Sequence, residues 1–211
     1  MKLVNKSISE FSELLATEMP VPGGTSAAAV QVAHGLALLN MVASLTIERK
    51  KYAKFEELMR AATEQVDDLR TLMLEIVDRD VEAFSVLSGV FKESRKTDTE
   101  IVVRDEAMQS ALKLCALIPF EIIECALIAL ELASEMVGKV NANAIGDFGV
   151  AVLSLKSAAQ GAWLCLLANL DGIRDEIFSA KYTIASSELV RVITELADNI
   201  YTDILNGLLP D

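Results

Sequence analysis

Residues 58–91 read LMRAATEQVDDLRTLMLEIVDRDVEAFSVLSGVF, and their apolar side chains recur at spacings of three and four. This periodicity is typical of an amphipathic helix that buries one face. We predict a single long helix over about 51–91. The apolar stripe has one gap, between Ile76 and Phe84, and Asp80 fills it. The helix therefore places a carboxylate on its buried side.

The composition of the whole chain favours helices of the same kind. Of 211 residues, 52% are apolar and only 5% are aromatic, and the four prolines leave long proline-free stretches. This mixture is typical of packed aliphatic helices rather than of a β-sandwich. We predict a single all-α domain over 1–211, an antiparallel bundle of long helices that forms a two-fold dimer.

Capping signals set the expected bounds of the other helices. Ser7 and Thr97 each begin a capping box with a glutamate three residues later, and Thr25 or Ser26 can cap a helix after a Pro-Gly breaker. Pro119 suits the first turn of a further helix. The expected helices cover 7–18, 25–46, 97–117, 119–138, 147–170 and 187–208.

Charge and cysteine content exclude several classes of protein. The net charge of -12 argues against a nucleic-acid partner, because phosphates attract basic surfaces. Cys115, Cys125 and Cys165 show no short paired spacing, so we expect reduced thiols, no metal site and no disulfide. The first residues lack the apolar core of a signal peptide, which predicts a cytoplasmic location.

Residues 19–47 contain no charged side chain and are followed by the basic residues Arg49 to Lys51, as at the end of a membrane span. Polar interruptions at Gln31 and His34 favour instead a helix buried at the centre of a bundle or dimer. His34, the single histidine, is interpreted as a core or interface residue. A membrane protein is the alternative, and we expect no membrane partner.

Asp80 is the best candidate for chemistry that the residue pattern alone provides. A buried carboxylate is costly unless it is paired or hydrogen-bonded. Burial also raises its pKa, which suits general acid–base catalysis. The alternative is a structural carboxylate that caps or pairs with another helix. Asp78 and Glu82 lie on a more polar face, where we expect solvated carboxylates.

Two loops add backbone and amide groups. Adjacent Gly23 and Gly24 precede a helix, whose N-terminal amides can bind an anion or a carbonyl group, and a rigid turn is the alternative. Asp147 begins a second apolar helix, where the helix dipole also favours a carboxylate as a cap. Asn141 and Asn143 precede it. The basic residues before the long helix suit an acidic substrate tail or a solvated helix start.

The order and spacing of these motifs resemble the folate cyclodeaminase/cyclohydrolase family. That family includes stand-alone methenyltetrahydrofolate cyclohydrolases and the cyclodeaminase half of formiminotransferase-cyclodeaminase. The resemblance implies an all-helical dimer with folate bound in a cleft near the subunit interface. The matching stretches are 20–28 (PVPGGTSAA), 46–52, 78–84 (DRDVEAF), 118–119, 141–147 (NANAIGD) and 169–170.

Carried over residue by residue, the resemblance implies a proton shuttle at Asp80, with Asp147 as its partner or orienter. It implies a tetrahydrofolate derivative as ligand, including polyglutamylated forms, and neither a metal nor a cofactor beyond the folate substrate. The residues implied to hold the pterin, the folate carbonyl or the glutamate tail are Pro22, Gly23, Gly24, Ser26, Lys50, Lys51, Tyr52, Asn141, Asn143 and Asn169.

Three residues depart from the usual pattern of the family: Thr25 stands in place of a glycine, Gly146 of a serine and Cys165 of an asparagine. Two hypotheses follow. The first is a formiminotetrahydrofolate cyclodeaminase or methenyltetrahydrofolate cyclohydrolase, acting at the carbon that bridges N5 and N10. The alternative, which the three departures motivate, is a non-catalytic folate-binding or partner-subunit protein of the same family.

Overall fold

The computed structural model describes residues 2–209, which contain helices and no β-strand. The all-α prediction is confirmed for this part of the chain. Short 3-10 helices at Leu3–Asn5, Lys50–Phe55 and Ala142–Ala144 lie in the connections. The α-helices are α1 (Ile8–Leu15), α2 (Gly24–Thr46), α3 (Glu56–Phe91), α4 (Asp98–Met136), α5 (Ile145–Leu170) and α6 (Glu176–Leu208).

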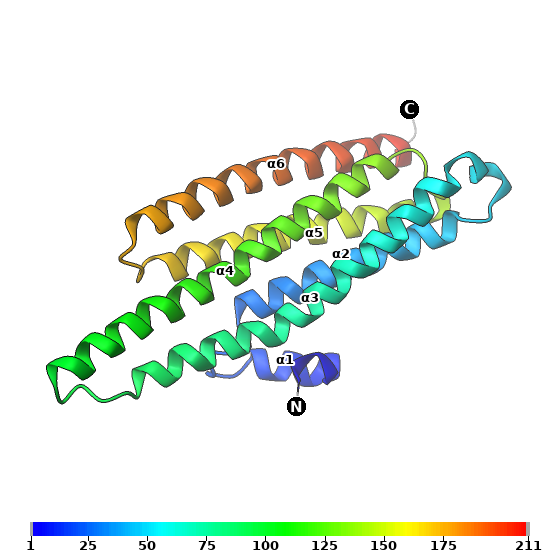
Figure 1. The fold of residues 1–211 in the computed structure, drawn as a ribbon. Coiled ribbons are helices and arrows are strands. Elements are labelled where there is room, and N and C mark those ends of the chain that lie inside the picture. The colour runs from blue at the N-terminus through cyan, green and yellow to red at the C-terminus, as the bar shows by residue number, and fades with distance from the viewer. Residues whose placement is uncertain (1, 210–211) are drawn as a thin grey trace.

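Helices α2 to α5 form a central four-helix bundle (Figure 1). Helix α2 packs against α3 and α5, and α4 packs against the same two helices. The N-terminal segment lies against α2 and α3, while α6 lies over α4 and α5. Two sides of the bundle are therefore left uncovered, one between α3 and α4 and one between α2 and α5.

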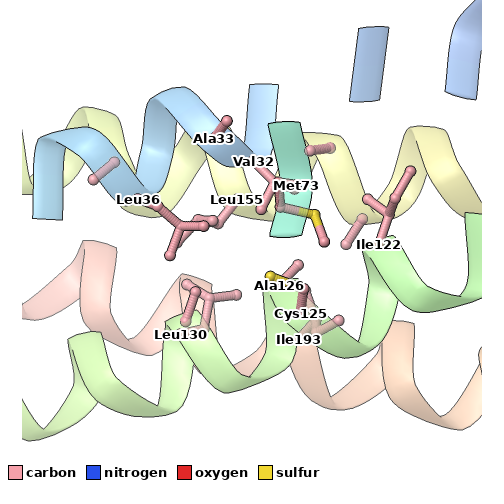
Figure 2. Packing of buried hydrophobic residues seen from close by; sticks show 14 of the residues in the cluster. Val32, Ala33, Leu36, Met73, Ile122, Cys125, Ala126, Leu130, Leu155 and Ile193 are labelled. Atoms are coloured by element: carbon pink, nitrogen blue, oxygen red, sulfur yellow. The ribbon is translucent and has the colours of Figure 1, made fainter. Parts of the chain in front are cut away.

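One aliphatic core fills the centre of the bundle. Figure 2 shows Leu36 of α2, Met73 of α3, Leu130 of α4 and Leu155 of α5 directed toward a common centre, and all four are fully buried. Burying a side chain of this size contributes about 2 kcal/mol. The sum over the core explains how a chain with few aromatic residues holds such long helices together.

Helices α2 and α5 approach each other closely at Gly35. A Cβ atom at this position would lie 2.9 Å from Leu155 Cγ and 3.2 Å from the Ala151 carbonyl oxygen. The segments 24–46 and 142–170 are long and apolar enough to cross a membrane by length and composition. Core helices of soluble proteins pass the same test, and half of the apolar window of α2 is buried inside the bundle.

Pro119 lies inside α4, so the predicted break between 117 and 119 is wrong. Proline has no N–H, and the carbonyl group of Cys115, four residues earlier, therefore loses its partner in the helix. The side-chain amide of Asn169 in α5 donates a 2.9 Å hydrogen bond to that carbonyl oxygen. The helix continues because a residue far away in the sequence replaces the missing donor.

Three helix ends differ from the sequence prediction by three residues or more. Helix α6 begins at Glu176 rather than 187, because the Asp175 side chain accepts the N–H of Phe178 and caps the helix there. Helix α3 begins at Glu56 rather than 51, after a 3-10 turn. Helix α1 ends at Leu15 rather than 18.

The capping boxes predicted at Ser7 and Thr97 are confirmed, since each hydroxyl accepts the N–H of the glutamate three residues later. At α2 the prediction is wrong, because Gly23 rather than Thr25 or Ser26 occupies the N-cap. Glycine has no side chain with which to accept the free N–H groups of the first turn. An acceptor for the start of α2 must therefore come from another helix.

Candidate functional site

Asp80 of α3 supplies a hydrogen-bond acceptor for the first turn of α2. Its Oδ2 accepts a 2.5 Å hydrogen bond from the hydroxyl of Ser26, which is fully buried in the first turn of α2. Burial raises the pKa of Asp80, while hydrogen bonds from the Ser26 hydroxyl and backbone amide partly offset this shift. Asp80 thus caps a neighbouring helix and is also a half-buried carboxylate with a raised pKa, as acid–base chemistry requires.

Asp80 lines a cavity of about 210 Å³ at the N-terminal end of α2. Four helices and the loop before α2 contribute to its wall. Because these segments are distant in the sequence, only the fold brings their side chains together. The other lining residues are Pro20, Val21, Gly23, Gly24, Thr25, Phe84, Leu87, Cys115 and Asn169.

Both glycines of the loop allow close packing around this cavity. A Cβ atom at Gly24 would lie 2.9 Å from Cys165 Sγ, and one at Gly23 would lie 3.2 Å from the Pro20 carbonyl oxygen. A larger residue at Gly24 would push α2 away from α5. Cys165, one of the departures from the family pattern, therefore packs directly behind the glycine loop.

Cys115 and Asn169 form the wall opposite the glycine loop. Asn169 is held in place by its hydrogen bond to the Cys115 carbonyl oxygen. Burial, assisted by the nearby charge of Asp80, raises the pKa of the Cys115 thiol. A neutral thiol is a poor nucleophile, so the titratable group with a chemical role at this cavity is Asp80.

A second cluster lies at the opposite, C-terminal end of α2. Lys50, Lys51 and Tyr52 come from the 3-10 turn before α3, and Asn141 and Asn143 come from the connection between α4 and α5. Together with Arg49 and Ala142 they line an open cavity of about 430 Å³. Its cationic side chains are exposed, which makes it suitable for an anionic group.

Hydrogen bonds link the connection between α4 and α5 to the C-terminal end of α2. The backbone N–H of Asn141 donates to Thr46 Oγ1, and the Asn141 side chain donates to the Leu45 carbonyl oxygen, both at 2.9 Å. The N–H of Ala142 donates to the Tyr52 hydroxyl at 3.0 Å, which lowers the pKa of Tyr52. Asn141 and Tyr52 therefore hold the cluster together.

The predicted site residues fall into two groups within one chain. Helix α2 has 23 residues, which at 1.5 Å per residue separates its ends by about 35 Å. One chain therefore does not bring Asp147, exposed in the first turn of α5, to Asp80. Pro22, Gly23, Gly24, Ser26 and Asn169 lie at the Asp80 end, and Lys50, Lys51, Tyr52, Asn141 and Asn143 lie at the Asp147 end.

Sequence reasoning did not predict six residues of the Asp80 cavity and misjudged Asp78 nearby. The six are Pro20, Val21, Thr25, Phe84, Leu87 and Cys115. Phe84 follows Asp80 by one helical turn, so periodicity could have found it. Cys115 reaches the cavity only because α4 crosses there, and no local signal marks it. Asp78 is buried and accepts the N–H of Leu3 at 2.6 Å, so the expected solvated position is wrong.

The chain is similar to known proteins over most of its length. The family model described as formiminotransferase-cyclodeaminase matches residues 7–188. A methenyltetrahydrofolate cyclohydrolase of Methylorubrum extorquens is 34% identical over 197 residues, covering 93% of this chain and 95% of that protein. A formimidoyltransferase-cyclodeaminase of Rattus norvegicus is 27% identical over 179 residues, which cover 85% of this chain and 33% of the rat protein.

A solved structure has the same fold. The formiminotetrahydrofolate cyclodeaminase of Thermotoga maritima matches with a TM-score of 0.87 and 24% sequence identity, covering 97% of this chain and 98% of that chain. The resemblance predicted from the motifs is confirmed by the family match and by the relative of nearly equal length. On these findings the chain belongs to the formiminotransferase-cyclodeaminase family.

Proposed function

We propose that this protein is a one-carbon tetrahydrofolate enzyme that acts at the carbon bridging N5 and N10. The observation that carries the proposal is Asp80, a half-buried carboxylate with a raised pKa in the wall of a cavity. Similarity to a methenyltetrahydrofolate cyclohydrolase over nearly the whole of both chains favours the cyclohydrolase reaction. Similarity to the formimidoyltransferase-cyclodeaminases favours the cyclodeaminase reaction as the second candidate.

Both reactions need a group that moves a proton at a tetrahedral carbon. In the cyclohydrolase reaction, water adds to the methenyl carbon and the bond from this carbon to N5 then breaks, leaving a formyl group on N10. Asp80 accepts one proton of the water and donates it to N5, while the other water proton leaves to solvent. In the cyclodeaminase reaction, N10 attacks the carbon of the protonated formimino group, and Asp80 transfers the N10 proton to the formimino nitrogen. The bond from the carbon to this nitrogen then breaks, which releases ammonia and leaves the methenyl cation. The proposal includes no metal and no cofactor beyond the folate substrate.

We also propose a two-fold dimer formed by the side of the bundle between α2 and α5. The other uncovered side, between α3 and α4, carries the ion pair of Arg79 with Glu121. The side between α2 and α5 exposes apolar residues, among them Leu45, Val150 and Leu153. An exposed apolar face of this kind suits a permanent interface.

The dimer would join the two clusters of predicted site residues. A two-fold axis perpendicular to α2 pairs this helix with its copy in antiparallel orientation. The N-terminal end of α2, with Asp80, would then lie beside the C-terminal end of the partner helix. The basic pair Lys50 and Lys51 of one subunit would meet the glutamate tail of a folate bound at Asp80 of the other. Asp147 would reach Asp80 in the same way, as its partner or orienter.

We propose a cytoplasmic location with no nucleic-acid and no membrane partner. The net charge of -12 supports the first exclusion, because a nucleic-acid surface is itself anionic. Burial of α2 in the bundle and the proposed interface between α2 and α5 support the second. Dimers that stay in solution without detergent are the expected result, and a requirement for detergent would contradict the proposal.

A turnover assay with 5,10-methenyltetrahydrofolate and 5-formiminotetrahydrofolate tests the reaction. We expect turnover of at least one substrate, and an Asp80→Asn variant should lower kcat by roughly 10²–10⁴-fold, as loss of a general acid–base group does. Glu82→Gln, an exposed carboxylate on the same helix, is the control. Calorimetric binding of both folates without turnover would instead support the non-catalytic alternative.

A further inference from the structure

We propose that the aminobenzoyl-glutamate arm of the substrate leaves the Asp80 cavity along α3 and that its carboxylate binds Lys92 of the same chain. The identity of the arm rests on the proposed function. The location of the groove does not, because it follows from the shape and charge of the chain beside Asp80.

A second cavity of about 430 Å³ adjoins the Asp80 cavity. The two cavities share Pro20, Val21 and Phe84 as walls. These three residues form the boundary between the cavities, and our proposal takes a ligand seated at Asp80 past Phe84 into the larger space. We call this larger space the α3 groove.

The floor of the α3 groove is one face of a single helix. Its residues recur at spacings of three and four along α3, which places them on the same side. Apolar side chains lie at the end next to Asp80, hydroxyl groups follow, and a cation lies at the far end. This order matches an aromatic ring followed by an amide and a carboxylate. The lining residues from α3 and its C-cap are Val81, Phe84, Ser85, Ser88, Gly89 and Lys92.

The length of the groove also suits such an arm. At 1.5 Å per residue, Phe84 lies about 6 Å along the helix from Asp80, and Lys92 lies about 12 Å beyond Phe84. The flexible stem of lysine lets its ammonium group move back along the groove. With the bridge carbon at Asp80, the aromatic ring would pack on Phe84 and the first glutamate would approach Lys92.

The charge at the far end of the α3 groove is unusual for this acidic chain. The connection between α3 and α4 carries Lys92, Arg95 and Lys96 against one carboxylate, Glu93, although the whole chain has a net charge of -12. Across residues 2–209 none of these three cations forms an ion pair. Lys92 would therefore bind the first glutamate, and the partner's basic pair at Lys50 and Lys51 would contact longer polyglutamyl tails.

Two variants separate the shape of the groove from its charge. Gly89→Leu should fill the groove without disturbing the helix, because a Cβ atom there meets no other atom within 4 Å. Gly207→Leu on α6 is its control, since that position is equally open. Lys92→Glu reverses the charge at the far end, and Lys181→Glu, also exposed on α6, is the matched control.

The first readout is calorimetric titration with N-(4-aminobenzoyl)-L-glutamate, with 4-aminobenzamide as the uncharged probe. Lys92→Glu should weaken binding of the first probe roughly tenfold or more, as loss of a charge-assisted hydrogen bond does, and leave the second unchanged. Gly89→Leu should weaken both. In turnover, Lys92→Glu should raise KM for a monoglutamyl substrate while kcat stays unchanged. The two controls should bind both probes like the unmodified protein.

The outcomes separate this inference from the proposed function. If aminobenzoyl-glutamate does not bind, or binds Lys92→Glu and Gly89→Leu as tightly as the unmodified protein, the α3 groove is wrong even where turnover is normal. If the probe binds and Lys92→Glu weakens it while no folate is turned over, the groove is correct and the proposed reaction is wrong.

Discussion

The hydroxyl of Ser26 and the carboxylate of Asp80 are joined by a 2.5 Å hydrogen bond between the first turn of α2 and the middle of α3. The contact is shielded from water, because Ser26 is fully buried. One carboxylate oxygen is thereby fixed to the helix, and the other is left for chemistry. Ser26 thus positions Asp80, and its removal should change how Asp80 titrates.

Replacing Ser26 with alanine should shift the acidic limb of the pH–rate profile to higher pH. Burial already raises the pKa of Asp80, and the Ser26 hydroxyl opposes this shift. Without the hydroxyl the pKa rises further, so the ionised base is lost at a higher pH as the solution is acidified. The measurement is kcat/KM as a function of pH. Ser26→Thr keeps the hydroxyl and should restore the original limb, whereas an unmoved limb in Ser26→Ala would show that Ser26 does not tune Asp80.

Replacing Asn169 with alanine should destabilise the fold by about 1–3 kcal/mol, the cost of an unsatisfied buried acceptor. The acceptor is the Cys115 carbonyl group, to which Pro119 cannot donate a hydrogen bond because it has no N–H. Pro119→Ala restores a backbone N–H, so the double variant Asn169→Ala/Pro119→Ala should recover part of this loss. Urea denaturation of the two single variants and the double variant gives the coupling. Strictly additive effects would contradict the link between the proline and the amide.

Mixing two inactive variants should restore activity if the two subunits share each site. One variant is Asp80→Asn and the other is the double variant Lys50→Glu/Lys51→Glu, assayed with a polyglutamylated substrate. Half of the randomly mixed dimers are hybrids with one intact site of two, so about a quarter of full activity should return. A mixture of Asp80→Asn with Asp80→Ala, which lacks the carboxylate in every site, is the control. If activity does not return in the first mixture, the Asp80 cluster of one subunit and the Lys50–Lys51 cluster of the other do not form a common site.

Replacing Leu153 with glutamate should separate the proposed dimer into monomers. Leu153 is 43% exposed on α5, and a carboxylate there would be buried without a partner at the interface. Light scattering gives the mass of the particle, and turnover should fall together with dimer content. Val86→Glu is the control, because Val86 is 53% exposed on α3, away from the side between α2 and α5. A monomeric unmodified protein would refute the interface directly.

Local patterns in the sequence predicted the helical features that depend on interactions between residues close together in the chain. The apolar stripe of α3 and the capping boxes at Ser7 and Thr97 involve residues within a few turns of one another, and all are present. The continuation of α4 through Pro119 was not predictable, because the replacement donor, Asn169, lies 54 positions from the carbonyl group that it serves.

The candidate site was predictable in its parts and not in its assembly. Asp80 was recognised because a carboxylate interrupted an apolar stripe, and burial with a raised pKa agrees with that reasoning. The pattern could not identify Ser26 as its partner, since that depends on which helix end crosses α3. Nor could it place Asp147 about 35 Å away along α2, because the distance between two motifs in space depends on the direction of the helix between them.

The hydrogen bond from Asn169 to Cys115 also determines which molecules the Asp80 cavity can distinguish. One N–H of this amide is committed to α4, which fixes the orientation of the amide and leaves its oxygen and its second N–H to contact a bound molecule. An oxygen accepts hydrogen bonds and does not donate them. The cavity therefore presents one acceptor and one donor in fixed places, and it discriminates against an isostere in which the N–H and the lone pair are exchanged. A proline in α4 thus determines, through the amide that replaces its missing N–H, the ligand chemistry accepted at α5.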